Sequence, residues 1–454
     1  MKAVGIIKDK DFWKKTLLIG IPIALQELLS TGLNLVDTLM LSSMGDATVA
    51  ATGLANKIFF IFTIFIFGIS SGSGILTSQY WGKRDVENIR KVLGISILIG
   101  IGVSLSFLLP SVTVPQMVMR ILTPNQEMIK IGAVYLCITV WGYPIMAVAK
   151  AYASAMRGMN QVVIPAIINL LAIVLNIFLN YLLIFGNCGF PELGVVGAAV
   201  ATIIARYAEG IGLLVIIYIK KNPAATTIKK LFDFNIVFVK KYIITILPVV
   251  ANEFMWGLGI TMYSLVYGRM RDVEVAAITI TQTIEEVFLV IFQGISAASA
   301  VVLGNELGAD RLKRADRYAV NYILLQTAFS LMMSFACLML RLPIIHLFRS
   351  ITYEVQSLVN CCLRVFAIFL PFKMLNYLII TGILRSGGDT KAAFVLEVTG
   401  VWCVGIPLAV LGGLVLKLPI YVVYAMVFLE EVYRFVLSFI RYRKKKWLKN
   451  IIEK

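Results

Sequence analysis

The sequence is short of charged side chains and of histidine. Asp, Glu, Lys and Arg make up 15% of its 454 residues, where soluble domains average about 25%, and only one histidine is present. A soluble fold cannot hide a chain that is 59% hydrophobic and lacks long polar segments. Disordered and collagen-like proteins are excluded by the same composition. The sequence therefore indicates a membrane protein with several spans.

The six cysteines lack the spacing of a disulfide framework or a zinc site, and no C-x-x-C motif occurs. The single histidine, His346, lies in a predicted outer loop. An intramembrane enzyme would need a metal cluster, an aspartate pair or a nucleophile beside a base. The sequence offers none of these, so we expect no enzymatic activity and no cofactor.

Apolar stretches long enough to cross a bilayer occur twelve times, and the segments between them are too short for a soluble catalytic domain. The predicted fold is an all-α polytopic membrane protein. Its spans are expected near 17–41, 50–76, 92–114, 131–155, 162–185, 194–219, 242–267, 275–303, 318–340, 357–383, 391–414 and 419–440.

Basic residues are retained on the cytoplasmic side of a membrane, and here their distribution is lopsided. Most of the 42 lysines and arginines fall on the side of the N-terminus. The opposite side holds Arg120, Lys130, Arg269, Arg271, Arg341, Arg349 and Lys417. We therefore expect a cell-membrane protein with both termini in the cytoplasm. Its basic runs are interpreted as orientation signals and lipid contacts, with no nucleic-acid partner.

The chain contains an internal repeat, because residues 22–85 align on 248–311 without a gap at an offset of 226. After the fourth span of each half, Arg157 aligns with Arg385 at an offset of 228. The other matches include Pro22 with Pro248, Glu27 with Glu253, Asp46 with Asp272, and Gly68-Ile69-Ser70 with Gly294-Ile295-Ser296.

The repeat predicts two six-helix bundles related by a pseudo-two-fold axis along the membrane normal. The expected domains are an N-terminal bundle at 1–219, a cytoplasmic linker at 220–241 and a C-terminal bundle at 242–454. Duplicated bundles are typical of secondary transporters that bind substrate between their halves. A channel is less favoured, because no filter motif such as T-V-G-Y-G occurs.

Polar residues share one face of the first predicted helix at three- and four-residue steps: Glu27, Ser30, Asn34 and Asp37. An ionised side chain at the centre of a membrane helix costs at least about 2.5 kcal/mol, so this face should line the bundle interior or water. Asp37 is the candidate proton or cation carrier. The alternative is a buried acid that is neutralised by Lys57 or Lys150.

Asn176 and Asn180 are four residues apart and share a face of the fifth span. With Asp37 and Thr202 they are candidates for an oxygen cage that holds Na⁺, or for a network that controls the protonation of Asp37. The alternative is a hydrogen bond that only joins helices.

The second half carries acidic and aromatic side chains that suit organic cations. The candidate cavity residues there are Glu253, Trp256, Tyr263, Gln282 and Glu286, with Glu27 and Asn34 from the first helix. Core packing is the alternative for the aromatic residues. Two further charge groups are expected to neutralise themselves at helical spacing. These are Glu430 and Glu431 with Arg434, and Arg206 with Glu209.

Several motifs resemble the multidrug and toxic compound extrusion (MATE) family of transporters over essentially the whole chain. They are the spacing from Pro22 to Val36-Asp37-Thr38, Gly68-Ile69-Ser70-Ser71-Gly72, Gln79-Tyr80-Trp81-Gly82, Asn176 and Asn180 before Phe185-Gly186, and Gly382-Ile383-Leu384-Arg385-Ser386-Gly387-Gly388-Asp389-Thr390.

The resemblance implies twelve helices, a V-shaped central cavity, and export of amphiphilic, often cationic compounds in exchange for Na⁺ or H⁺. It assigns the cation or proton site to Asp37, Asn176, Asn180 and Thr202, a C-half acid to Glu253 and a hinge to Pro22. Departures are Met374 and Asn180, where some relatives carry Asp, and Glu397, where many do. We expect a monomer. The rival function is a flippase for lipid-linked oligosaccharides, which would need a basic cavity.

Overall fold

The computed structural model describes residues 9–42, 44–348 and 352–453. The side chains of residues 31, 34–39, 42, 46, 291 and 347 are also outside the description. The predicted roles of Asn34 and Asp37 therefore concern side chains that lie outside the described residues. Across the part of the chain that is described, every regular element is a helix, which confirms the predicted all-α fold.

The first half begins with four spans and a short helix. They are α1 (Lys10–Ser42), α2 (Asp46–Gly82), α3 (Val86–Thr113), α4 (Pro115–Arg120), and α5 (Gln126–Thr139) continued by η2 (Val140–Gly142) and α6 (Tyr143–Gly158). Two more spans and two short turns follow. They are α7 (Val163–Phe185), η3 (Asn187–Gly189), α8 (Gly194–Ile219) and α9 (Ile228–Leu231).

The second half begins with α10 (Ile236–Tyr267), α11 (Asp272–Gly308), α12 (Leu312–Leu347) and α13 (Tyr353–Tyr377), which continues into η4 (Leu378–Leu384) and η5 (Arg385–Gly387). The next span is α14 (Thr390–Val398), η6 (Thr399–Gly405), α15 (Ile406–Val410) and η7 (Leu411–Val415), and the last is α16 (Ile420–Arg443). The segments η4, η6 and η7 are π-helical, a wide winding that occurs often at functional sites.

Within the described residues, ten helical segments are long and apolar enough to cross a membrane. The remaining long helices are α1 and α16, and α16 carries Glu430, Glu431 and Arg434 in its middle. All twelve long segments coincide with the twelve predicted spans.

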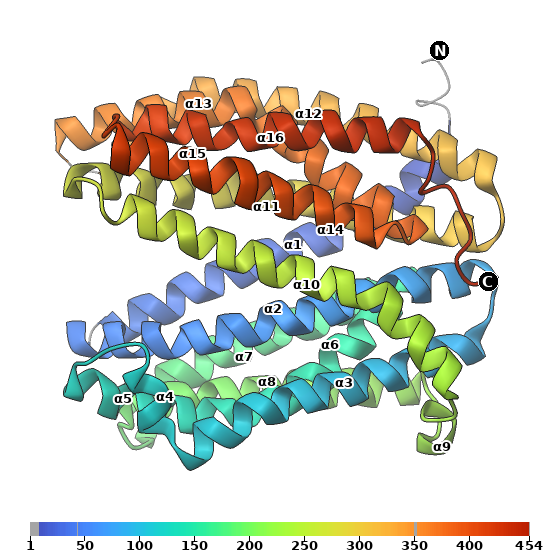
Figure 1. The fold of residues 1–454 in the computed structure, drawn as a ribbon. Coiled ribbons are helices and arrows are strands. Elements are labelled where there is room, and N and C mark those ends of the chain that lie inside the picture. The colour runs from blue at the N-terminus through green and yellow to red at the C-terminus, as the bar shows by residue number, and fades with distance from the viewer. Residues whose placement is uncertain (1–8, 43, 349–351, 454) are drawn as a thin grey trace. The chain divides into compact units, whose positions relative to one another are not determined.

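The chain divides into two compact units (Figure 1). The N unit comprises Leu25–Ile246, and the C unit comprises Met1–Ala24 with Leu247–Lys454. Each of α1 and α10 therefore contributes one part to each unit. The predicted bundle boundaries rest on membrane spans and stay a prediction.

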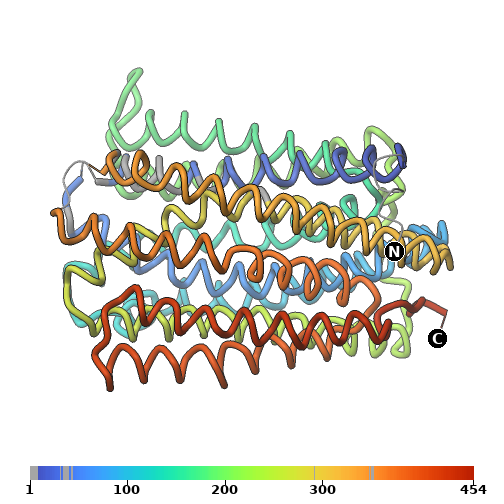
Figure 2. The backbone as a smooth tube through the Cα atoms, turned by 90° about the horizontal axis from the view of Figure 1, so that it is seen from above, coloured from blue at the N-terminus to red at the C-terminus, as the bar shows by residue number. Residues whose placement is uncertain are grey.

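In the N unit the long helices run side by side (Figure 2), with α7 packed along α8, and α2 packed against α3 and α6. One apolar core cluster gathers Met119, Leu136, Ile184 and Ala199 from α4, α5, α7 and α8. These four side chains are 0–2% exposed, so the helices that carry the polar groups described below are tightly packed.

The C unit has a core built on Phe292, Phe366 and Tyr424 from α11, α13 and α16. The start of α1 approaches α11 closely, because a Cβ added to Gly20 would lie 3.2 Å from the carbonyl oxygen of Gly294. Glycine pairs of this kind let membrane helices pack backbone to backbone. The start of α1 is therefore an integral part of the C unit.

Candidate functional site

The amide side chains of α7 meet as the sequence predicts. Asn176 and Asn180 are 4% and 2% exposed, and Nδ2 of Asn180 donates to Oδ1 of Asn176 at 3.4 Å. Thr202 lies on the neighbouring α8, where its hydroxyl donates to the Ala198 carbonyl at 2.9 Å. The Thr202 oxygen thus keeps lone pairs for a cation or an incoming donor. A role for these three residues around Asp37 stays a prediction.

A second polar group of the N unit surrounds Glu209 on α8, which is 9% exposed. Its carboxylate accepts a hydrogen bond from Asn169 at 2.9 Å and lies 3.8 Å from the guanidinium of Arg206. This confirms the predicted pair of Arg206 and Glu209. Lys150 also acts on Glu209 electrostatically, so this lysine has an acidic neighbour other than Asp37.

An ion pair in the C unit joins Glu253 on α10 to Arg385 in η5. The guanidinium Nη1 donates to Oε1 of Glu253 at 2.7 Å, and Arg385 is 3% exposed. In the N unit, Glu27 acts on Arg157 electrostatically. The internal repeat aligns Glu27 with Glu253 and Arg157 with Arg385. Each unit therefore carries the same acid and base at equivalent places of the repeat.

Arg434 on α16 is the centre of a buried acidic cluster. Its guanidinium contacts Glu430 at 3.0 Å and Glu431 at 2.6 Å, which confirms the pairs predicted from helical spacing. It also contacts Glu397 on α14 at 2.9 Å, a pairing that spacing along one helix cannot predict. Arg434 is 6% exposed. One cation therefore faces three carboxylates in a buried region.

Neighbouring helices supply neutral donors to the same carboxylates. Tyr263 donates to Glu430 at 2.5 Å, and Nδ2 of Asn252 donates to Oε2 of Glu397 at 2.9 Å, both from α10. Asn376 on α13 donates to Oε2 of Glu431 at 2.9 Å. These hydrogen bonds to carboxylates join α10, α13, α14 and α16.

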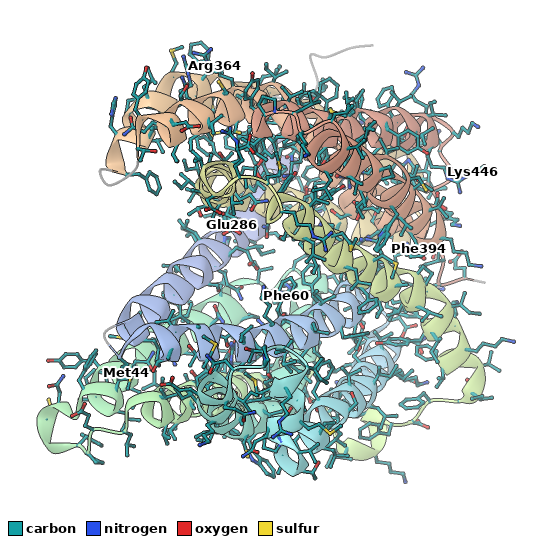
Figure 3. The ribbon with its side chains drawn as sticks, turned by 60° about the vertical axis from the view of Figure 1, so that its left-hand side comes forward. Met44, Phe60, Glu286, Arg364, Phe394 and Lys446 are labelled. Atoms are coloured by element: carbon teal, nitrogen blue, oxygen red, sulfur yellow. The ribbon has the colours of Figure 1, made fainter. Side chains whose placement is uncertain are left out.

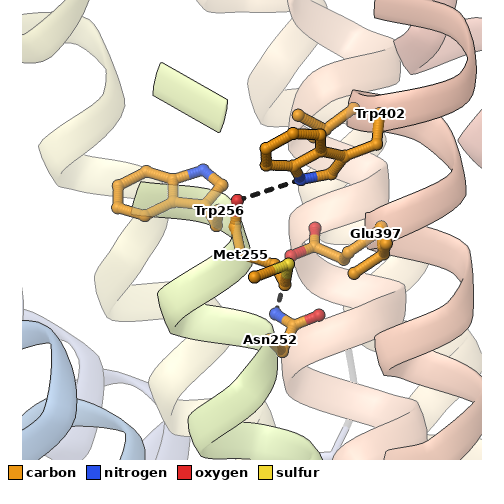
Figure 4. A pocket seen from close by; sticks show the side chains of 7 residues that line it. Asn252, Met255, Trp256, Glu397 and Trp402 are labelled. Carbon is orange, nitrogen blue, oxygen red and sulfur yellow. Dashed lines mark hydrogen bonds between the residues drawn. The ribbon is translucent and has the colours of Figure 1, made fainter. Parts of the chain in front are cut away.

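A small pocket opens beside Glu397 (Figure 4). Its lining includes Asn252, Trp256, Glu397 and Trp402. Trp402 donates its indole N–H to the carbonyl of Met255 at 3.2 Å. Oδ1 of Asn252 is buried without a hydrogen-bond partner, although Asn252 is only 2% exposed. The pocket therefore joins a carboxylate to an unsatisfied acceptor.

The predicted cavity residues of the C unit differ in their surroundings. Glu253 accepts a hydrogen bond from Arg385, and Tyr263 donates one to Glu430. Trp256 is 40% exposed. Gln282 is half-buried on α11 and Glu286 is exposed on the same helix (Figure 3). A shared substrate site for these five side chains stays a prediction.

Glycines in η6 let the backbone approach the hydrogen-bonded carboxylates around Arg434. A Cβ on Gly405 would collide with the Tyr263 hydroxyl and with Oε2 of Glu430, and a Cβ on Gly400 would lie 2.6 Å from Cδ of Arg434. We expect Gly405→Ala to break the hydrogen bond from Tyr263 to Glu430, because a methyl group would occupy its place. The overpacking cost is about 1–3 kcal/mol.

A melting curve of the purified protein checks this expectation. Gly102→Ala is the matched control, since a Cβ there meets nothing within 4 Å. Equal melting temperatures for the two variants would contradict it.

Pro22 lies inside α1, which continues as a helix on both sides of it. Pro248 lies at the equivalent place in α10. Pro22 is two residues before Ala24, where α1 passes from the C unit to the N unit, and Pro248 follows Ile246, where α10 passes between the units in the opposite direction. A proline removes a backbone hydrogen bond at such a point, and the hinge role of Pro22 stays a prediction.

Some polar residues escaped the sequence-based prediction of the site. Asn252, Asn376 and the link from Glu397 to Arg434 were missed, although Asn252 directly precedes Glu253 in the sequence. In the described residues no three His, Cys, Asp or Glu side chains lie together as a metal site. The predicted sodium ligands include Asp37, whose side chain is outside the description.

Both halves of the chain match one family model, MatE, over residues 22–182 and 248–411. The chain belongs to the MatE family. The two matches begin at Pro22 and Pro248, at the offset of 226 that the internal repeat shows. Members of the MatE family are transporters, which agrees with a membrane protein of two repeated halves.

Curated relatives of this MatE chain cover most of its length. The "Uncharacterized transporter YisQ" of Bacillus subtilis is 23% identical over 447 residues, with 98% of each chain covered. The "Probable multidrug resistance protein NorM" of Halalkalibacterium halodurans is 22% identical and covers 90% of this chain and 88% of its own. The "Probable multidrug resistance protein YoeA" of Bacillus subtilis is 26% identical, with 87% and 86% covered.

Solved structures of MATE transporters share the fold. A mutant of the Vibrio cholerae MATE transporter VcmN superimposes with a TM-score of 0.88 at 18% identity, covering 98% of this chain and 99% of that one. A MOP superfamily transporter from Pyrococcus furiosus gives a TM-score of 0.85 at 18% identity, covering 98% of each chain. For the latter, a reverse polarity of the binding pocket suggests a different function. These likenesses confirm the twelve-helix fold.

Proposed function

We propose that this protein is a secondary antiporter of the cell membrane that exports amphiphilic cations in exchange for H⁺ or Na⁺ by alternating access. Multidrug resistance proteins among its relatives support this role. The main support for this proposal is the excess of carboxylates over cations among the buried side chains of the C unit. An acidic interior attracts cations and repels the pyrophosphate of a lipid-linked sugar.

We assign the coupling ion to Asp37, Asn176, Asn180 and Thr202. The two amides and the threonine hydroxyl present oxygen atoms in the N unit, and such oxygens can bind a hard cation or accept a hydrogen bond from a protonated carboxyl. For the substrate we favour Trp256 and Glu286, since these side chains are exposed. Glu253 and Tyr263 can contact substrate only after their hydrogen bonds to Arg385 and Glu430 break.

Asp37→Asn is expected to slow gradient-driven efflux at least about tenfold, equivalent to about 1.4 kcal/mol in a rate, because the amide cannot release a proton or carry charge. The assay is efflux of a fluorescent organic cation from proteoliposomes, driven separately by Na⁺ and H⁺ gradients. Asp310→Asn is the matched control, since Asp310 is exposed and has a φ of 57°, which asparagine tolerates.

Efflux that follows one gradient, survives in Asp310→Asn and collapses in Asp37→Asn supports the antiporter and identifies its ion. Gradient-independent movement of the cation would contradict it. Flipping of a lipid-linked sugar, or export of an anion instead, would replace the proposal with the rival function.

A further inference from the structure

The charges of the C unit do not balance. Arg434 faces Glu397, Glu430 and Glu431, while the nearby Arg385 is already paired with Glu253. Lys373 lies 3.7 Å from Glu285 and cannot neutralise both that acid and the cluster. If every carboxylate were ionised, two negative charges would remain uncompensated in a buried region. Such a cluster lowers its free energy by binding a cation.

Glu397 is the member of the cluster that borders the pocket. Its side chain is 14% exposed, against 8% and 7% for Glu430 and Glu431. Its Oε1 accepts from Arg434 and its Oε2 accepts from Asn252. Beside it, Oδ1 of Asn252 has no partner. The arrangement combines a partly exposed carboxylate with a buried acceptor that lacks a hydrogen-bond donor.

We infer that Glu397 and Asn252 form a proton-binding site of the C unit, in which a proton on Glu397 weakens its pairing with Arg434. This inference rests on the proposed antiport. The pocket beside Glu397 is too small for a drug-sized ligand, whose sites measure roughly 300–1,000 Å³. A metal ion fits poorly, because both oxygens of Glu397 already accept N–H donors and no described group of side chains is arranged to hold a metal.

The proton transfer balances without another reactant. A proton from water bonds to Oε2 of Glu397, and the amide of Asn252 rotates by half a turn. Oδ1 then replaces Nδ2 and accepts the new O–H group. Glu397 becomes neutral, whereas Glu430 and Glu431 remain on Arg434. The contact between α14 and α16 thereby loses its charge attraction, directly before the π-helical segment η6.

Other charged groups face Glu397 from the elements packed around it. Glu253 from α10, and Glu430 and Glu431 from α16, favour uptake of the proton. Arg434 from α16 and Arg385 from η5 oppose it. Acids therefore outnumber bases around Glu397, and a proton on Glu397 would relieve part of the repulsion among them.

Infrared difference spectroscopy of the full-length protein in lipid, recorded as the pH is lowered, tests the site directly. We expect a protonated-carboxyl band in the wild type that loses one component in Glu397→Gln and persists in Glu354→Gln, an exposed glutamate of the same unit. Glu397→Asp keeps the charge if Glu397→Gln fails to fold, and should shift that component. A band unchanged in both Glu397 variants overturns the inference.

Efflux separates this inference from the proposed function. Glu397→Gln should reduce efflux driven by a pH gradient at least about tenfold. A carboxyl band that depends on Glu397 in a wild type without gradient-driven efflux would reject the antiporter and keep the proton site. Wild-type efflux with a band independent of Glu397 would keep the antiporter and reject the site.

Discussion

Arg434→Met should destabilise the protein by about 3–5 kcal/mol, the range for removing one partner of a buried ion pair. The substitution leaves Glu397, Glu430 and Glu431 facing one another without their shared cation. Methionine fills a similar volume, so the loss reports charge and hydrogen bonding more than packing. Thermal unfolding in detergent, followed by size-exclusion chromatography, measures the effect.

Two further variants test this explanation. Arg434→Lys should recover only part of the stability, because a single ammonium group does not reproduce the fork of a guanidinium that contacts three carboxylates. Adding Glu397→Gln and Glu431→Gln to Arg434→Met should raise the melting temperature again, since fewer charges remain buried. Wild-type stability of Arg434→Met would show that the cluster does not hold the C unit together.

Glu253→Gln and Arg385→Met should each lower the free energy of unfolding by more than half of the loss seen in the double variant. Removing either residue leaves a buried partner unpaired, and Arg385 is only 3% exposed, with Nε and Nη2 already lacking partners. Removing both eliminates the unpaired charge. A double-mutant cycle should therefore give a coupling free energy of about 1–3 kcal/mol.

The repeat supplies a matched comparison for this pair. Glu27→Gln and Arg157→Met change the equivalent positions of the N unit, where Glu27 acts on Arg157. We expect coupling of the same sign there. Additive effects of Glu253→Gln and Arg385→Met on the melting temperature would contradict a stabilising ion pair.

Much of the fold follows from one-dimensional patterns. Apolar length predicts each of the twelve long segments, and the offset between Pro22 and Pro248 reappears in the two MatE matches. Contacts within one helix are also predictable, as the pairing of Arg434 with Glu430 and Glu431 shows. Helical spacing alone fixes which of these side chains meet.

Contacts between helices could not be predicted in the same way. Glu397 and Arg434 are 37 residues apart and meet only because α14 packs on α16. The passage of α1 and α10 between the two units and the π-helical winding of η6 leave no clear signal in hydrophobicity. Asp389 stands at the N-cap of α14 without capping it through its side chain, which accepts hydrogen bonds from Arg441 at 2.7 and 2.8 Å.

Exchange of ions for substrate is the most direct measurement of the proposed function. In an antiporter the coupling is reciprocal, so an imposed substrate gradient must drive the coupling ion in the opposite direction. An organic cation gradient across proteoliposomes that contain the purified protein should move H⁺ or Na⁺ against it, detected by an ion-sensitive dye inside the vesicles. Movement of the cation with no opposing ion flux, at any pH or sodium concentration, would contradict antiport.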